Sequence, residues 1–240
     1  MNDLGNGAPL SRTAASRAVE AIGWRYVLGA LCTSVAVTSL DRALQITSDV
    51  VAVGGQQVDD HLRVDLRPDR VELSLQTRAI GALTVRDTEL ARDISAAVAR
   101  RGAVTGGATA TELARPVQML EMAIDALDIP TIRPFWKAVM AYTDEPGTGG
   151  PDDAIVDPVG QLPAIWFQQM DAPRPQRNRV HFDITVAHDE AEPRVRAALD
   201  AGGVLVDDSY ARSFWVLADV EGNEVCVCTW TDRDERLPDG

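Results

Sequence analysis

The clearest alternation of apolar and polar positions lies in the stretch VDDHLRVDLRPDRVELSLQTR. Leu62, Val64 and Leu66 alternate with polar side chains, and the alternation resumes after Pro68 and Asp69. A period of two is typical of a half-buried strand, and a Pro-Asp dipeptide is typical of a turn. The pattern therefore predicts a β-hairpin with one apolar face.

The turn decides which residues of this hairpin face one another. If the two turn residues form the whole connection, Arg67 faces Arg70 and His61 faces Gln76. Arg78 then lies diagonally within reach of His61. Because these side chains are polar, we expect a polar site on this part of the hairpin.

Helical periodicity flanks the strands on both sides. Ser11 is expected to cap the first helix, and Thr84 with Asp87 forms a capping box at the start of the third. The expected elements are a helix over residues 11–22, strands over 24–28 and 31–37, a helix over 40–55, the hairpin, and a helix over 84–101. This order is typical of an α+β domain whose helices gather on an antiparallel sheet.

The second half of the chain begins after a Gly- and Thr-rich stretch. Such a composition is typical of a linker, here residues 102–116, which separates domains over 10–101 and 117–232, with tails over 1–9 and 233–240. We expect a strand at VQMLEMAI, a helix over 131–140 with Pro134 in its first turn, and strands over 154–157 and 162–169. A strand at RVHFDITV, a helix at EAEPRVRAALDAGG and strands over 204–206, 214–218 and 224–229 follow. This order predicts two successive βαβββ units.

Composition narrows the classes of partner. The chain has 240 residues, 45% of them hydrophobic, and a formal charge of -13, which disfavours nucleic acid and anionic membrane surfaces as partners. No apolar run reaches about 18 residues, and the N-terminus lacks a signal-peptide pattern, so a cytoplasmic location is expected. Three cysteines without a CxxC pair predict reduced core thiols.

Four phrases of the first half resemble the pterin-4a-carbinolamine dehydratase family. They are AVEAIGWRYV, SLDRALQITSDVV, VDDH and LTVRDTELA, within residues 10–100. The resemblance implies a four-stranded antiparallel sheet with three helices on one face. It also implies the loss of water from a 4a-hydroxytetrahydropterin, a reaction that needs general acid and base catalysis near neutral pH.

The family's site pattern is only partly present. Asp60 stands at the first histidine position and Arg78 at the third, whereas His61 and Asp87 match. The resemblance implies His61 as acid and base, Asp60 and Asp87 as catalytic partners that orient and polarise, and Arg78 and Gln76 as pterin-binding residues. Alternatively, Asp87 only begins a helix, His61 is a solvated strand residue, and Asp60 pairs with Arg78 on the surface.

The second half resembles a glyoxalase-like domain of the vicinal oxygen chelate superfamily. The phrases are RPFWKAVMAY, NRVHFDITV, AALDAGGVLV and DVEGNEVCV. The resemblance implies a divalent metal held by Glu121, His181, Cys226 and, less directly, Gln168. This mixture of donors disfavours magnesium and manganese and is compatible with zinc. Alternatively, Cys226 is a small core residue and His181 a hydrogen-bonded strand residue.

Three functions remain open from the sequence. The first is a pterin dehydratase of reduced activity that acts on a small-molecule pterin, with no cofactor established. The second is a noncatalytic pterin-binding or dimerisation module. The third is a metal-dependent lyase, isomerase or dioxygenase in the second domain. An exposed sheet edge in the first domain favours a homo-oligomer.

Overall fold

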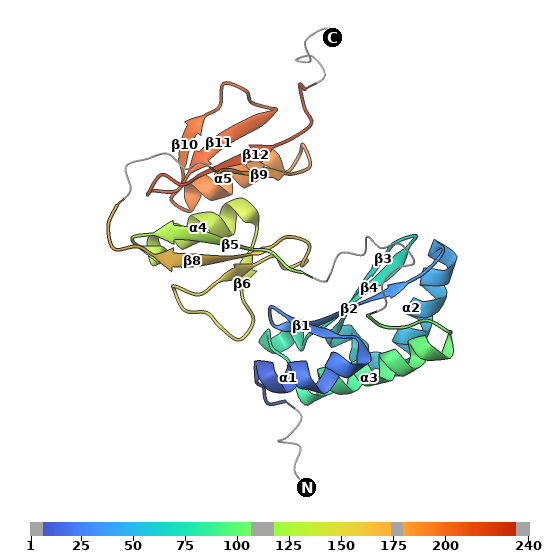
Figure 1. The fold of residues 1–240 in the computed structure, drawn as a ribbon. Coiled ribbons are helices and arrows are strands. Elements are labelled where there is room, and N and C mark those ends of the chain that lie inside the picture. Colours follow the sequence, from blue (N-terminus) through green and yellow to red (C-terminus); the bar gives the residue numbers. More distant parts are fainter. Residues whose placement is uncertain (1–6, 107–117, 174–179, 234–240) are drawn as a thin grey trace. The chain divides into compact units, whose positions relative to one another are not determined.

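The computed structural model describes residues 7–106, 118–173 and 180–233. The chain divides into two compact units, residues 1–119 and 120–240 (Figure 1). The expected tails and the expected linker lie largely outside the described residues. The described part of that linker packs on the first unit, since Thr105 forms a β-bridge with Val35.

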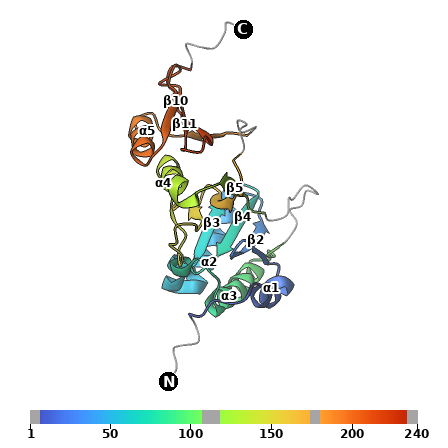
Figure 2. The ribbon, with the colours of Figure 1, turned by 90° about the vertical axis from the view of Figure 1, so that its left-hand side faces the viewer.

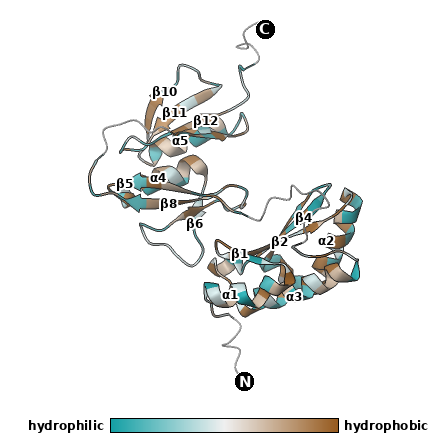
Figure 3. Ribbon diagram, in the orientation of Figure 1, coloured by the Kyte–Doolittle hydropathy of each residue, from teal (hydrophilic) through white to brown (hydrophobic). Residues whose placement is uncertain are grey.

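The first unit is an antiparallel four-stranded sheet with helices on one side, as expected (Figures 1 and 2). The strands are β1 (Arg25–Val27), β2 (Ala30–Ala36), β3 (Leu62–Leu66) and β4 (Arg70–Leu75), in the order β1-β2-β4-β3. The helices are α1 (Arg12–Val19), α2 (Leu40–Gly54) and α3 (Val85–Arg100), with 3-10 turns η1 (Glu20–Ile22), η2 (Gly55–Asp60) and η3 (Arg78–Ile80). Figure 3 shows α2 and α3 banded in hydrophobic and hydrophilic colours, as amphipathic helices should be.

The hairpin has the predicted register. Leu62 pairs with Leu75 and Leu66 with Val71. The Arg67 amide donates to the Arg70 carbonyl, so Pro68 and Asp69 form the whole turn. Leu73 and the other inward residues of β4 are buried, which confirms the alternation.

The core of the first unit gathers around Trp24 and the inward faces of β2 and β4. Trp24 is fully buried, and its indole N–H donates to Ser95 of α3 at 2.9 Å. Gly23, with a φ of 80°, ends the first helical segment and turns the chain so that Trp24 enters the core. This packing fixes α3 against the sheet.

The second unit contains two four-stranded sheets that share one hydrophobic core. The first comprises β5 (Glu121–Ala126), β6 (Thr143–Asp144), β7 (Ile155–Val156) and β8 (Ala164–Gln169), with α4 (Ile129–Met140) between β5 and β6. The second comprises β9 (Phe182–Thr185), β10 (Val204–Asp207), β11 (Phe214–Ala218) and β12 (Glu224–Cys228), with α5 (Ala191–Asp200) between β9 and β10. The repeated βαβββ order was predicted, but the short strand β6 was not among the strands expected for the first repeat. Helix α4 packs against α5.

One expectation about α4 is wrong. The helix begins at Ile129, because Asp128 caps it by accepting from the Thr131 amide. Pro130 therefore occupies the first turn, and Pro134 lies inside the helix. In the described part of the chain, no helix is long and apolar enough to cross a membrane.

Candidate functional site

His61 lies where the 3-10 turn η2 meets strand β3. Its amide donates to the Val58 carbonyl at 3.1 Å, and its carbonyl accepts from the Gln76 amide at 3.0 Å. These bonds hold the backbone from both sides, so the imidazole projects from a rigid position. The side chain is 12% exposed.

Asp87 lies in the first turn of α3 and is fully buried. Its Oδ2 accepts from the Thr84 amide at 2.7 Å and from the Thr77 hydroxyl at 2.7 Å. The first bond belongs to the capping box, which confirms that part of the sequence analysis. Burial of this carboxylate is tolerated because backbone and hydroxyl donors surround it.

The second oxygen of Asp87 holds His61. Nδ1 of His61 lies 2.8 Å from Oδ1 of Asp87. Because a carboxylate only accepts hydrogen bonds, Nδ1 carries a proton, and the neutral form of the ring has its lone pair on Nε2. Asp87 therefore caps the helix and orients the histidine at the same time, so the two interpretations from the sequence are not exclusive.

Nε2 of His61 is the ring nitrogen that does not contact Asp87. It makes no hydrogen bond within the described residues, and it is not one of the buried polar atoms without a partner. Nε2 therefore faces solvent. A neutral imidazole with a free Nε2 can accept a proton and return it near neutral pH.

The other predicted residues of the first unit have different surroundings. Asp60 is exposed at the end of η2. Gln76 donates from Nε2 to the carbonyls of Gly29 and Gly81, at 3.1 and 3.2 Å, and so fixes two turns. Arg78 begins η3 and is half-buried, and its side chain makes no hydrogen bond or ion pair within the described ranges. Its guanidinium is therefore available to a ligand.

Thr77 is the site residue that the sequence analysis missed. Its hydroxyl lies 2.7 Å from Asp87 Oδ2, 3.0 Å from Thr84 Oγ1 and 3.3 Å from His61 Nδ1. The available signal was its place in the hairpin, one residue after Gln76, which faces His61. Thr77 therefore contacts the helix-capping residue Thr84, and its hydroxyl shares Asp87 Oδ2 with the Thr84 amide.

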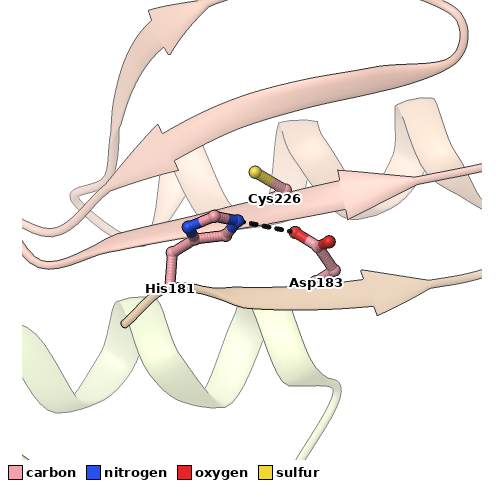
Figure 4. A group of neighbouring side chains, drawn as sticks. All are labelled: His181, Asp183 and Cys226. Carbon is pink, nitrogen blue, oxygen red and sulfur yellow. Dashed lines mark ion pairs between the residues drawn. The ribbon is translucent and has the colours of Figure 1, made fainter. Parts of the chain in front are cut away.

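The predicted metal ligands of the second unit divide between its two sheets. Glu121 and Gln168 are exposed on β5 and β8, which pair in parallel. His181 immediately precedes β9, and Cys226 lies on β12. The ligand atoms of His181, Asp183 and Cys226 all lie within 4.8 Å of one another, and Glu121 is not part of this group (Figure 4).

Asp183 was not predicted, although the sequence contained a signal for it. It lies two residues after His181, so the period of a strand places both side chains on the same face. His181 Nε2 and Asp183 Oδ1 are 3.6 Å apart. Cys226 is the register partner of Asp183 across the β9 and β12 pair.

Burial and neighbouring charges raise the pKa of one side chain near each sheet of the second unit. Burial, with the Asp183 charge as a further cause, raises the pKa of the Cys226 thiol to about 12. On the other sheet, burial and the neighbouring Glu121 carboxylate raise the pKa of Glu145. Glu121 therefore has another acid as a near neighbour.

The donor set around His181 can be tested against a divalent metal by its chemistry. One imidazole, one carboxylate and one thiol fit zinc, whereas magnesium and manganese prefer oxygen ligands. The residues present are therefore compatible with a metal of the zinc class and not with a magnesium-type site.

The DVEGNE turn before β12 has a structural explanation. The Asp219 carboxylate is 2% exposed and accepts from the amides of Glu221 and Asn223, the Asn223 side chain and the Trp136 indole. Glu221 in turn accepts from the amides of Leu127 and Asp128 at the start of α4. This turn fastens the second sheet to the first helix of the unit.

Comparisons with known proteins agree with this division. Residues 8–97 match the family model described as pterin 4 alpha carbinolamine dehydratase, and residues 121–228 match the glyoxalase-like domain model. No curated protein matches the sequence.

Several solved structures are similar to parts of this chain. A transcriptional coactivator/pterin dehydratase from Brucella melitensis is 22% identical, covers 38% of this chain and 98% of its own, and has a TM-score of 0.34. A glyoxalase/bleomycin resistance protein/dioxygenase family enzyme from Burkholderia phytofirmans is 17% identical, with coverages of 45% and 95% and a TM-score of 0.38. The fosfomycin resistance protein FosX from Mesorhizobium loti is 9% identical, with coverages of 50% and 98% and a TM-score of 0.40.

Proposed function

We propose that this chain, a pterin dehydratase-like domain fused to a glyoxalase-like domain, dehydrates a 4a-hydroxytetrahydropterin in its first unit with His61 as the only histidine of the site. The observation that carries the proposal is the 2.8 Å contact between His61 Nδ1 and the buried Asp87. A pair of this kind is what a general acid and base needs, because it fixes both the tautomer and the direction of the ring.

A single imidazole suffices for the proton balance of this reaction. The C4a–O bond breaks, a ring nitrogen supplies the electron pair for the new C=N bond, and the hydroxyl leaves as water. One proton leaves the ring nitrogen and one joins the hydroxyl, so the enzyme gains and loses none. Nε2 of His61 takes the first proton and delivers the second, while Asp87 stabilises the imidazolium between the two transfers.

Arg78 is assigned to binding. Its guanidinium carries five donors and cannot exchange protons, so it suits the carbonyl edge of a pterin. Gln76 acts indirectly, since its side-chain amide donates to the carbonyls of Gly29 and Gly81 and so holds these two turns together. Asp60 is exposed next to His61 and contributes negative charge near the imidazolium.

The test measures how fast a 4a-hydroxytetrahydropterin generated in situ is lost in the presence of the protein, and compares this rate with the uncatalysed rate. His61→Gln should lower kcat by about 10²–10⁴-fold with a small change in KM. The matched control is His188→Gln, which removes an exposed histidine of the second unit and should leave the rate unchanged. Arg78→Ala should raise KM more than it lowers kcat.

Two results would oppose the proposal. Equal turnover in His61→Gln and the wild type would remove His61 from the reaction. A wild-type rate equal to the uncatalysed rate would show that the protein does not catalyse this reaction. Calorimetric titration with a tetrahydropterin would then decide whether the unit is a noncatalytic binding module.

A second candidate function, self-association, is supported by helix α2. Leu40, Leu44 and Val51 are 52%, 58% and 44% exposed, and their spacing places them on one face of the helix. We propose that this apolar stripe packs against a second copy of the chain. Light scattering should report a homo-oligomer, and Leu44→Lys should reduce its mass. A monomeric wild type would exclude this assembly.

A further inference from the structure

The open face of the β9 and β12 pair presents three different metal-binding groups. His181 and Asp183 project from one strand end, and Cys226 projects between them from the neighbouring strand (Figure 4). The strand period places His181 and Asp183 on one side, and the parallel register sets Cys226 beside Asp183. Two adjacent strands therefore fix the arrangement without any loop.

The separations approach those of a tetrahedral site. Zinc bonds of about 2.0–2.3 Å place neighbouring ligand atoms about 3.4–3.6 Å apart. His181 Nε2 and Asp183 Oδ1 are 3.6 Å apart, and the cysteine sulfur lies within 4.8 Å of both. Because the side chains of His181 and Asp183 are each 57% exposed, small rotations can close the remaining gap.

The local charge favours a cation. Within the described residues, the only ion-pair partner of Asp183 is His181, which is charged only when protonated. No lysine or arginine therefore forms an ion pair with this carboxylate in the described part of the unit. A bound cation would replace that weak pairing with direct coordination.

We propose that His181, Asp183 and Cys226 form a binding site for a divalent cation of the zinc class, with a fourth position open to water or a ligand. This set differs from the one implied by family resemblance, because Asp183 takes part and neither Glu121 nor Gln168 is required. The thiolate selects zinc-like ions over magnesium, manganese and calcium. Three protein ligands and one open position are typical of zinc sites that act on a bound molecule.

Cobalt is the probe for this site, because a cobalt–thiolate bond gives a near-ultraviolet charge-transfer band. Full-length protein, freed of metal by a chelator, is titrated with Co²⁺ and then with Zn²⁺. The wild type should bind one Co²⁺ with this band, and Zn²⁺ should displace it. Cys226→Ser should abolish the band, and Asp183→Asn and His181→Gln should each weaken binding by more than about tenfold.

Two variants serve as matched controls. Cys228→Ser removes the other thiol of β12, which is not part of the group, and should keep the band. Glu121→Gln removes the acid of the other sheet and should also keep it. Circular dichroism checks that every variant is folded.

Three results would overturn the proposal. The first is the absence of saturable Co²⁺ binding by the wild type. The second is a band that survives in folded Cys226→Ser. The third is a loss of binding in Glu121→Gln as large as in Asp183→Asn, which would return the site to the ligand set implied by resemblance.

Discussion

Replacing Asp87 by asparagine should reverse the tautomer of His61. Asp87 Oδ2 lies within 3.2 Å of three donors, the Thr84 amide and the hydroxyls of Thr77 and Thr84. The single oxygen of the new amide will occupy this side, because an NH2 group there would face the Thr84 amide. The NH2 group then points at His61 Nδ1, which can only accept from it. The proton of His61 must therefore move to Nε2.

The magnitudes separate this effect from a loss of folding. The asparagine side chain has the same shape as aspartate but forms neutral hydrogen bonds in place of charge-assisted ones. This change costs about 1–2 kcal/mol of stability. A histidine whose exposed nitrogen is protonated cannot act as a base, which costs about 10²–10⁴ in rate. That factor corresponds to about 3–5 kcal/mol in the barrier. Activity should therefore fall much further than stability.

Nitrogen NMR can observe the tautomer directly. The chain has only 3 histidines, so long-range proton–nitrogen correlation spectra at about pH 8, where a typical imidazole is neutral, are simple to assign. Wild-type His61 should carry its proton on Nδ1, and Asp87→Asn should carry it on Nε2. The same samples give kcat and, by urea unfolding, the change in stability.

Asp60→Asn is the matched control, because it removes the exposed carboxylate next to His61. It should leave the tautomer unchanged. The reasoning fails if wild-type His61 is protonated on Nε2, or if Asp87→Asn retains the Nδ1 proton. A tautomer change in Asp60→Asn would instead identify Asp60 as the controlling partner.

Three further predictions concern stability. Asp219→Ala should lower the free energy of unfolding by about 2–4 kcal/mol, because the buried Trp136 indole and three other donors lose their acceptor; urea unfolding followed by tryptophan fluorescence measures this. Gly23→Ala should lower it by more than about 2 kcal/mol, because φ is +80° and a Cβ would lie 2.1 Å from the Thr105 carbonyl oxygen; the Tm reports the loss. Burial, with the charge of Asp157, raises the pKa of Tyr142 to about 12. An unfolded tyrosine ionises at about pH 10, so the raised pKa of Tyr142 stabilises the fold fully below about pH 10, and this stabilisation is lost between about pH 10 and 12. The decline should vanish in Tyr142→Phe when the free energy of unfolding is measured against pH.

Each of these predictions has a control or a contrary outcome. Asp207→Ala removes a partly exposed carboxylate that accepts from the Ser209 amide, and it should cost much less stability than Asp219→Ala. Gly102 has a φ of +71° and open space around it, so Gly102→Ala isolates the backbone strain from the clash at Gly23. Equal losses at the two glycines would contradict the role of the Thr105 contact. An unchanged alkaline slope in Tyr142→Phe would contradict the assignment of Tyr142.

The sequence by itself determined the order of elements and the register of the hairpin. Alternation along Leu62, Val64 and Leu66, together with a Pro-Asp turn, leaves one register that buries the apolar face. The spacing of Thr84 and Asp87 likewise predicted the start of α3, since a capping box is formed by residues three positions apart. These features are local, and neighbouring residues suffice to decide them.

Tertiary structure alone decided which distant side chains meet. Asp87 reaches His61 across 26 residues, and its burial depends on how α3 packs against the hairpin. Thr77 joins them because the chain bends into η3 after β4, which no periodicity predicts. In the second unit, the parallel pairing of β9 with β12 sets Asp183 beside Cys226, while Glu121 stays beside Glu145 on the other sheet. Periodicity assigns a side chain to a face, but only the packing of distant elements determines its neighbours.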